Sequence, residues 1–296
     1  MRDEEEGKEE ILEKYRQAGK ILSQVRNEAA KKVEVGVHLL EVAEFVEEMI
    51  REKNAEPAFP CNISRNDEAA HATPALDDDA VFGNDMVKLD VGVHVDGYIA
   101  DTAITVDLSD HPDIVEAAEK ALSSAIEIIK AGTSTAEIGT IIEETIEGYG
   151  YKPVMNLTGH GLAQYNQHAP PTIPNRKVSK GIILKKGDVI AIEPFATDGV
   201  GRISERGLPE IYKLEKVRPV RSHEARELLK EIEKYKTLPF AKRWLSIDRL
   251  DLAIKQLEKA KVLHAFPILK EDGNGLVSQA EHTVIVQEDG CEVTTL

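Results

Sequence analysis

Two long β-rich runs joined by Asp96-Gly97 constrain the fold of this chain more than any other feature. The runs cover residues 86–95 and 98–106, and apolar residues predominate in both. Asp-Gly is the strongest short-range hairpin signal, because a type I′ turn needs two residues that tolerate positive φ. The sequence therefore predicts an antiparallel hairpin whose register is set by its turn.

Four segments have apolar residues at helical spacing. Steps of three and four residues between apolar positions predict helices at about 9–31, 38–53, 112–130 and 135–147. Pro112 near the start of the third helix and Gly132 beyond its end follow the usual asymmetry of helix termini. Two helix–helix–strand halves predict an α+β fold class, a pseudo-two-fold structure with helices covering one face of a curved antiparallel sheet.

Residues 222–261 break this pattern. They are rich in Lys, Glu and Leu, and we expect them to be helical throughout apart from a break at Leu238-Pro239. Ten Lys and Arg against seven Asp and Glu give this segment a local charge of +3. We interpret it as a helical insertion between two strands of the main sheet, with a solvated surface; docking on RNA or the ribosome is the alternative.

Composition and charge exclude several classes of protein. At 296 residues the chain has room for one large core with an insertion, or for two domains. It has no apolar run long enough to cross a bilayer, its first ten residues are too acidic for a signal or transit peptide, and its net charge of −16 argues against a general nucleic-acid surface. Its two cysteines, Cys61 and Cys291, form no CxxC pattern. We expect a cytoplasmic protein with no membrane or specific DNA partner.

Asp90 and Asp101 lie on the same face of the predicted hairpin. Gly92 lies opposite Asp101, so the two aspartates are diagonal cross-strand neighbours, about 7–8 Å apart, and Gly92 leaves room between them. Carboxylates among apolar residues repel each other and lose hydration unless a cation neutralises them. The two aspartates are therefore candidate metal ligands; the alternative is a half-exposed hairpin whose polar face meets water.

Three further residues have the same character. Glu193 ends an otherwise apolar strand, and Glu281 begins another. His160 stands between two glycines, which let an imidazole approach a ligand closely, although alone it is also readable as a loop histidine. If these residues converge with the aspartates, five oxygen and nitrogen ligands without sulfur suit Mn, Fe, Co or Zn, and bridging carboxylates suit a two-metal site.

Four other histidines divide into two kinds. His71 and His168 lie in predicted loops and are candidates for contact with a substrate. His94 lies beside the hairpin turn, and His282 points to the face opposite Glu281 by strand alternation. We interpret His94 and His282 as structural.

Five segments, in order, give the chain a resemblance to a known family. It resembles the methionine aminopeptidases of type 2, in their short archaeal form without an N-terminal extension. The resemblance covers essentially the whole chain and rests on Phe59-Pro60 followed by AAHATP, LDVGVHVDGYIADTA, GHGLAQYNQHAPPTIP, AIEPFAT and SQAEHTVIV.

The resemblance implies a role for each candidate residue. Asp90 is expected to bind one metal, Asp101 and Glu281 to bridge, and His160 with Glu193 to bind the other. His71 and His168 match substrate-contacting histidines, and Phe59 matches a wall of the methionine pocket, although it is also readable as a core aromatic. The family fold is the "pita-bread" fold, with residues 1–207 and 267–296 as the catalytic domain and 208–266 as the helical insertion.

The implied reaction is metal-dependent removal of the N-terminal methionine from nascent polypeptides with a small second residue. A metal-activated bridging hydroxide is expected to attack the carbonyl, with Glu193 relaying the proton. We expect a monomer that contacts the ribosome transiently. The alternatives are a prolidase or X-Pro aminopeptidase, which usually carries an N-terminal domain, and a non-catalytic relative that binds RNA or protein.

Overall fold

The computed structural model describes residues 2–296, whose helices and strands alternate in two similar halves. The helices are α1 (Arg2–Ala30), α2 (Leu39–Glu52), α3 (Pro112–Ile128), α4 (Thr135–Gly148), α5 (His223–Ile232) and α6 (Leu250–Lys259), with short 3₁₀ helices η1 (Glu233–Tyr235) and η2 (Lys242–Trp244). The strands are β1 (Glu56–Pro57), β2 (Asn62–Arg65), β3 (Glu68–Ala70), β4 (Met86–Val95), β5 (Tyr98–Asp107), β6 (Lys152–Pro153), β7 (Thr158–Ala163), β8 (Asn166–Pro174), β9 (Val189–Ile192), β10 (Phe195–Thr197), β11 (Ile203–Leu214), β12 (Pro239–Ala241), β13 (Leu263–Glu271), β14 (Val277–Gln279), β15 (His282–Gln287) and β16 (Gly290–Val293).

Strands β4 and β5 form the predicted hairpin. Both turn residues have positive φ, 53° at Asp96 and 87° at Gly97. Gly92 pairs with Asp101, which is the predicted register. The prediction is confirmed, and the turn therefore decides which residues of the two strands share a face.

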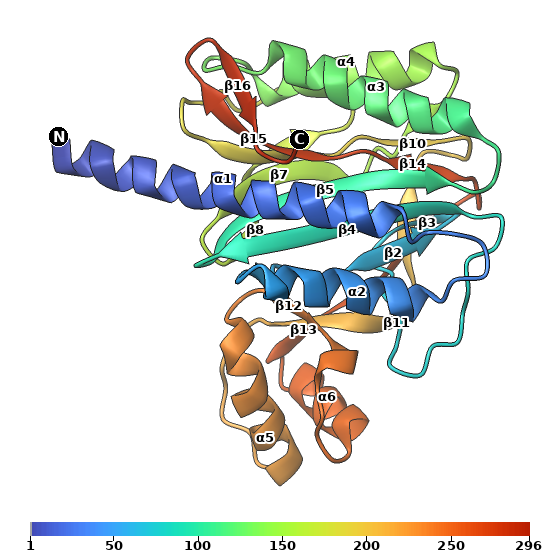
Figure 1. Cartoon of the computed structure of the whole chain (residues 1–296), viewed down its shortest axis with the longest axis vertical. Helices are drawn as coiled ribbons and strands as arrows, with labels where there is room; N and C mark the ends of the chain where they lie inside the picture. The colour runs from blue at the N-terminus through green and yellow to red at the C-terminus, as the bar shows by residue number, and fades with distance from the viewer. Residues whose placement is uncertain (1) are drawn as a thin grey trace.

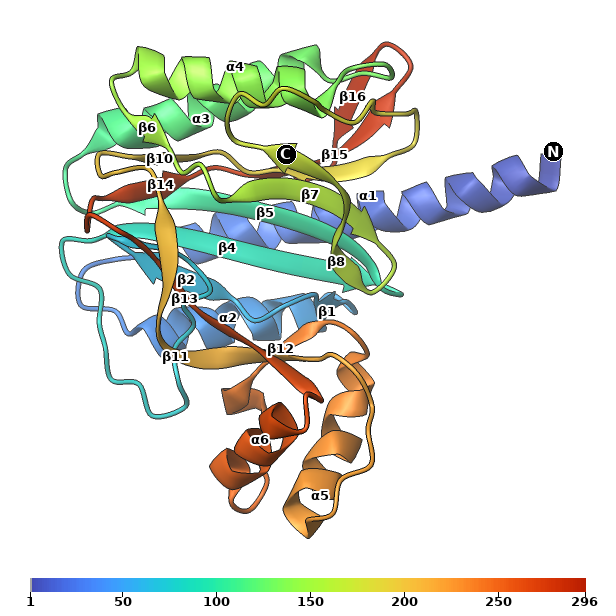
Figure 2. The same ribbon diagram turned by 180° about the vertical axis from the view of Figure 1, so that it is seen from behind.

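Each helix pair packs on its own set of strands, as Figures 1 and 2 show from opposite sides. Helices α1 and α2 share one hydrophobic cluster with β2, β4 and β5, and helices α3 and α4 share a second with β8, β9 and β15. Within residues 2–296 every strand pairing is antiparallel. The predicted α+β fold class is confirmed, although the hydrogen bonds divide the strands into four sheets.

The four long helices lie within a few residues of their predicted positions, except that α1 begins at Arg2. Helix α4 begins where Ser134 and Glu137 form a capping box, which satisfies free backbone N–H groups at the first turn. No helix of residues 2–296 combines the length and the apolar character needed to cross a membrane.

The segment 222–261 is not helical throughout, and that prediction is wrong. Between α5 and α6 the chain forms β12, which pairs with β11 at the edge of its sheet. Pro239 explains the difference, because proline has no N–H to donate and is tolerated as the first residue of an edge strand. Helices α5 and α6, at the bottom of Figure 1, pack on β11 and β13 through a hydrophobic cluster of their own.

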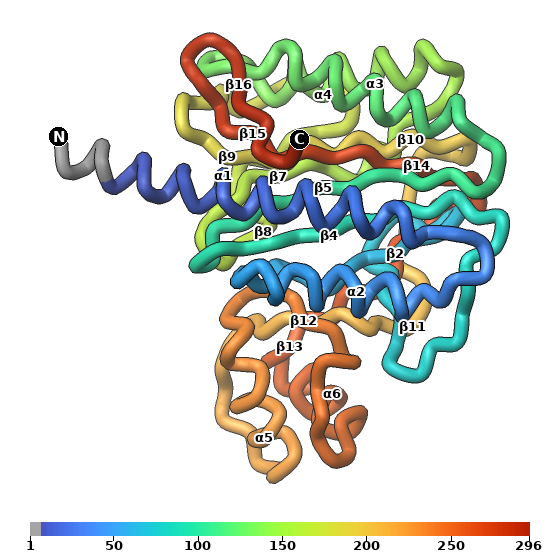
Figure 3. The backbone as a smooth tube through the Cα atoms, in the orientation of Figure 1, coloured from blue at the N-terminus to red at the C-terminus, as the bar shows by residue number. Residues whose placement is uncertain are grey.

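The last residues of the chain lie beside helix α1, where Ser23 Oγ donates to Leu296 O at 2.6 Å. Figure 3 shows the C-terminal strands in red beside the blue first helix. Arg26 of α1 donates to Thr295 O at 3.0 Å and to Thr102 Oγ1 of β5 at 2.9 Å. A buried arginine thus ties the first helix to the hairpin and to the end of the chain.

Candidate metal centre

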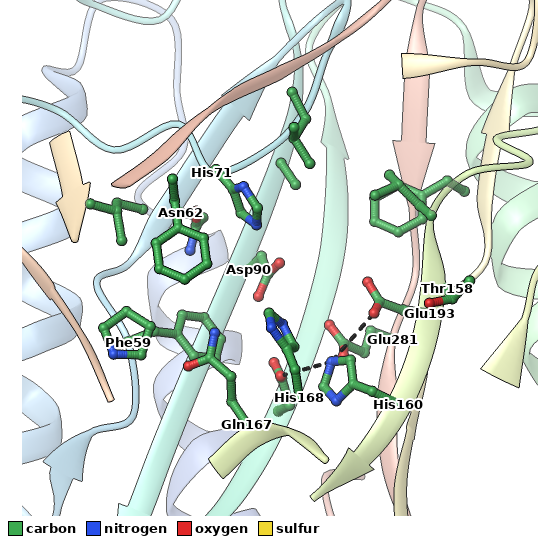
Figure 4. Close-up of a pocket in the computed structure, with 18 of the residues that line it drawn as sticks. Phe59, Asn62, His71, Asp90, Thr158, His160, Gln167, His168, Glu193 and Glu281 are labelled. Atoms are coloured by element: carbon green, nitrogen blue, oxygen red, sulfur yellow. Dashed lines mark ion pairs between the residues drawn. The ribbon is translucent and has the colours of Figure 1, made fainter. Parts of the chain in front are cut away.

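The five predicted metal-holding residues all line one cavity of about 520 Å³. They come from five separate elements: β4 supplies Asp90, β5 supplies Asp101, β7 supplies His160, the end of β9 is followed by Glu193, and Glu281 precedes β15. Figure 4 shows the labelled acidic groups and His160 directed toward a common space. Residues as far apart in sequence as Asp90 and Glu281 therefore share one chamber.

The polar atoms of this group lie at distances that a shared cation can span. His160 Nε2 is 3.4 Å from Glu193 Oε1 and 3.9 Å from Asp101 Oδ2. Asp101, His160 and Glu281 each offer one ligand atom, and these three atoms lie within 4.8 Å of one another. Because oxygen and nitrogen ligands bind such cations at about 2.0–2.2 Å, only small movements separate this geometry from coordination.

Some of the carboxylate oxygens lack the partners that buried charges need, although Gln279 Nε2 donates to Asp90 Oδ2 at 3.3 Å. Asp101 and Glu281 are 4% and 2% exposed, and Asp90 Oδ1 and Asp101 Oδ1 are buried without a hydrogen-bond partner. No Lys or Arg is among the described residues that line the cavity. A buried carboxylate without a cation or donors is costly, so this arrangement fits a bound cation.

Burial and crowding shift the titration of all four carboxyl groups. Loss of solvent raises the pKa of Asp90 to about 7. Burial, and then the charge of Asp90, raise the pKa of Asp101 and Glu193 well above their usual range. For Glu281 burial acts first and the neighbouring carboxylates act in the same direction on its pKa.

His160 is neutral and suited to coordination. Burial lowers the pKa of His160 to about 3. A proton on Nδ1, donated to Gly161 O at 3.3 Å, leaves Nε2 with a free lone pair toward Asp101 and Glu193. Carboxylates with one imidazole and no sulfur are donors that suit Mn, Fe, Co or Zn.

Hydrogen bonds fix the backbone behind these side chains. Thr283 Oγ1 accepts from Asp101 N and donates to Asp101 O, both at 2.8 Å. Thr102 Oγ1 donates to Glu281 O at 2.7 Å. These bonds hold β5 against the start of β15, so that the two acidic residues stay close despite their repulsion.

The two candidate substrate-contacting histidines line the same cavity. His71 has a positive φ of 64°, and its ring meets Phe266 edge-on with centroids 5.2 Å apart. Burial, and then His168, lower the pKa of His71 to about 4. With this lowered pKa, His71 is neutral at neutral pH and able to donate a hydrogen bond. The His168 ring lies 4.7 Å from that of His160, and His168 is exposed.

Phe59 lines the cavity and occupies the space beside Gly92. A Cβ at Gly92 would lie 2.2 Å from Phe59 Cε1. The interpretation that Gly92 only leaves room between two carboxylates is thus incomplete, because the ring of Phe59 fills that room. In the pairing of β4 with β5, Gly92 lies opposite Asp101, and Asp90 comes two residues before Gly92.

The two histidines interpreted as structural make local hydrogen bonds. His94 Nδ1 accepts from Gly97 N at 3.1 Å within the hairpin turn. His282 Nδ1 lies 2.8 Å from Thr295 Oγ1. Neither lines the cavity of the candidate centre.

Comparisons with known proteins agree with one another. The model of metallopeptidase family M24 matches residues 13–288. A methionine aminopeptidase of Archaeoglobus fulgidus is 56% identical over 289 residues, 97% of this chain and 99% of that protein. The chain belongs to the methionine aminopeptidases of family M24.

Solved structures share the fold. A methionine aminopeptidase from Thermotoga maritima has a TM-score of 0.72 at 23% identity, and the match covers 96% of this chain and 95% of that one. A prolidase from Pyrococcus furiosus has a TM-score of 0.59 at 20% identity, and the match covers 97% of this chain but 60% of the prolidase. The prolidase therefore carries a large part that this chain does not match.

Sequence reasoning missed several walls of the cavity. Ile211 of β11, Pro239 of β12 and Phe266 of β13 come from the insertion and its flanks, and they line the cavity together with Asn62 and Gln167. Apolar wall residues carry no chemical signature. Asn62 of β2 pairs with Asp90 of β4. No turn motif in the sequence predicts that pairing.

Replacing Asp101 with Asn should stabilise the metal-depleted protein. The four carboxyl groups have higher pKa values in the folded protein than in the unfolded chain. The free energy of unfolding therefore falls as the pH rises from about 4, the ordinary carboxyl pKa, through about 7, the pKa of Asp90 in the folded protein. Removing one charge should therefore raise Tm at pH 8 in chelator by at least about 2 °C, the effect of roughly 1 kcal/mol. Calorimetry with and without Mn²⁺ measures this, and an equal or lower Tm in chelator would contradict the crowding of charges.

Replacing Gly92 with Ala should weaken substrate binding. The new Cβ would displace the ring of Phe59 into the cavity, and overpacking costs about 1–3 kcal/mol, so KM for a methionyl peptide should rise roughly tenfold. Gly148→Ala is the control, since its Cβ would meet nothing within 4 Å. Adding Phe59→Leu should restore KM in part; no recovery would show that the ring is not the cause.

Proposed function

We propose that this protein removes the N-terminal methionine from polypeptides with a small second residue, as a type 2 methionine aminopeptidase with two divalent cations. The observation that carries the proposal is the set of five converging ligand groups with unpartnered carboxylate oxygens. The placement of α5 and α6 between β11 and β13 supports type 2.

Asp90, Asp101, His160, Glu193 and Glu281 would hold the cations. Bound divalent cations supply charge that polarises the scissile carbonyl and lowers the pKa of water. Glu193 accepts the proton of the attacking water and delivers it to the leaving nitrogen. The bond between the methionine carbonyl carbon and the next nitrogen breaks, and free methionine and a shortened peptide result.

His71 and His168 stabilise the carbonyl oxygen as it becomes negative during the attack. His71 Nδ1 is buried without a hydrogen-bond partner, so the ring keeps a position free for substrate. A neutral imidazole N–H can donate to the oxygen that becomes negative in the tetrahedral state, or to the peptide group. We assign this role to His71 and its neighbour His168.

The apolar part of the cavity suits the methionine side chain. Phe59, Phe195, Phe266 and Leu269 line it. A flexible, polarisable thioether packs well against aromatic rings. We assign the side-chain pocket to these residues, with Phe59 as one wall.

The cellular setting follows from the same proposal. Cys61 and Cys291 are both free, which fits a reducing cytoplasm. N-terminal methionines of nascent chains would be the substrates. A monomeric state and a transient ribosome contact remain predictions.

A prolidase is the second candidate because its fold is shared. The present cavity offers no argument for proline at the second position, and the match leaves two fifths of the solved prolidase uncovered. A non-catalytic relative that binds RNA or protein is disfavoured, since all five ligand groups reach one cavity.

Peptide assays separate these functions. Met-Ala peptides should release methionine with Mn²⁺ or Co²⁺, whereas Met-Lys and acetylated Met-Ala should resist and excess chelator should stop the reaction. Ala-Pro serves as the prolidase substrate. Free amino acid is measured by chromatography. Hydrolysis of Ala-Pro but not of Met-Ala would replace the proposed function, and activity in chelator would exclude a metal-dependent one.

Replacing His71 with Ala should slow the chemical step without loss of metal. Loss of one donor to a developing negative charge reduces kcat by about 10²–10³. Metal content by mass spectrometry should stay at the wild-type value, and His94→Ala, outside the cavity, should keep full activity. Loss of metal in the His71 variant would instead make it a ligand.

A further inference from the structure

A buried ion pair links the insertion to helix α2. The side chains of Arg243 in η2 and Glu47 in α2 are 3% and 4% exposed, and Arg243 Nη2 bonds Glu47 Oε1. Trp244 Nε1 donates to the other oxygen of Glu47 at 2.6 Å. The insertion is therefore attached to the catalytic domain by this ion pair as well as through β11 and β13.

The same arginine holds the loop that follows His71. Arg243 Nη1 donates to Thr73 Oγ1 at 2.7 Å and to Pro74 O at 3.0 Å. Thr73 Oγ1 in turn donates to Cys61 O at 2.7 Å. Cys61 N donates to Glu47 Oε1 at 3.2 Å, which closes a ring of hydrogen bonds. We call Glu47, Arg243, Thr73 and Cys61 the insertion clamp.

The insertion clamp includes Thr73, two residues after His71, which has a positive φ of 64°. A non-glycine residue in that conformation is held by its surroundings rather than by its own preference. Beyond the clamp, Ile63 N donates to Ala72 O at 2.7 Å. The Thr73 hydroxyl is the junction nearest to His71 in the sequence, and it bonds both the insertion and the segment before β2.

We propose that Arg243 and Thr73 are positioning residues, through which the insertion sets the place of the His71 ring in the cavity. This inference rests on the proposed function and adds a role for the insertion within it. A misplacement of about 1 Å at a group that contacts the reacting atoms can cost about 100-fold in rate. The orientation of His71 should depend on the clamp more than the affinity for methionine does, because Phe195 and Leu269 of the methionine pocket take no part in the clamp.

Thr73 offers a milder test than Arg243, because loss of the arginine would leave Glu47 buried without its partner and could unfold the protein. Thr73→Val keeps the shape and removes the hydroxyl, and Thr73→Ser keeps the hydroxyl. We expect Thr73→Val to lower kcat on Met-Ala roughly 10- to 100-fold, with KM within about twofold and metal content near wild type. Tm should fall by only several degrees, because Cys61 O loses its donor while the protein stays folded. Thr73→Ser should restore most of kcat.

A double-mutant cycle shows whether the effect passes through His71. In a His71→Ala background, Thr73→Val should change kcat by less than about twofold, because the positioned ring is gone. Equal kcat and KM for Thr73→Val and Thr73→Ser would refute the positioning role of the clamp but not the proposed function. A full 10- to 100-fold further loss of kcat in the His71→Ala background would have the same meaning. A wild-type protein that releases no methionine from Met-Ala would refute the proposed function and the clamp together.

Discussion

Four carboxyl groups crowded in one cavity without a cationic side chain are the constraint on which the rest of the structure depends. Their repulsion and lost hydration oppose folding, so the surrounding frame must hold them together. The frame consists of the hairpin turn at Asp96-Gly97 and the threonine bonds that join Asp101 to the start of β15. Bound cations would stabilise from the inside the same geometry that the frame holds from the outside.

The parts of the fold that were predictable are those that local chemistry decides. Asp96-Gly97 determines a register through two neighbouring residues, and the long helices follow from apolar spacing. The prediction for residues 222–261 was wrong because their composition favours a helix, whereas Pro239 and the open edge of β11 favour a strand. Tertiary contacts form that edge, and a short stretch of sequence carries no information about them.

The candidate site divides in the same way. A charged residue within an apolar stretch is easy to recognise in a sequence, and this is how Asp90, Asp101, Glu193 and Glu281 were found. The structure brings all four to one cavity. Their roles as ligands remain predictions. Apolar walls such as Ile211 look like any core residue, and the use of Gly92 as space for Phe59 depends on a close approach between β4 and a preceding loop.

Two buried electrostatic systems therefore adjoin the segment that carries His71. One is the carboxylate group of the cavity, and the other is the Glu47–Arg243 pair, in which both charges are compensated within the protein. A buried pair adds little stability over apolar packing, and Arg243 Nε has no hydrogen-bond partner among the described residues, so we infer that this pair serves to fix geometry. A rigid point of this kind behind a strained residue suits a position where small displacements affect the rate. The insertion that supplies Arg243 also supplies Ile211 and Pro239 to the cavity wall, so it belongs to the site and is not an appendage to it.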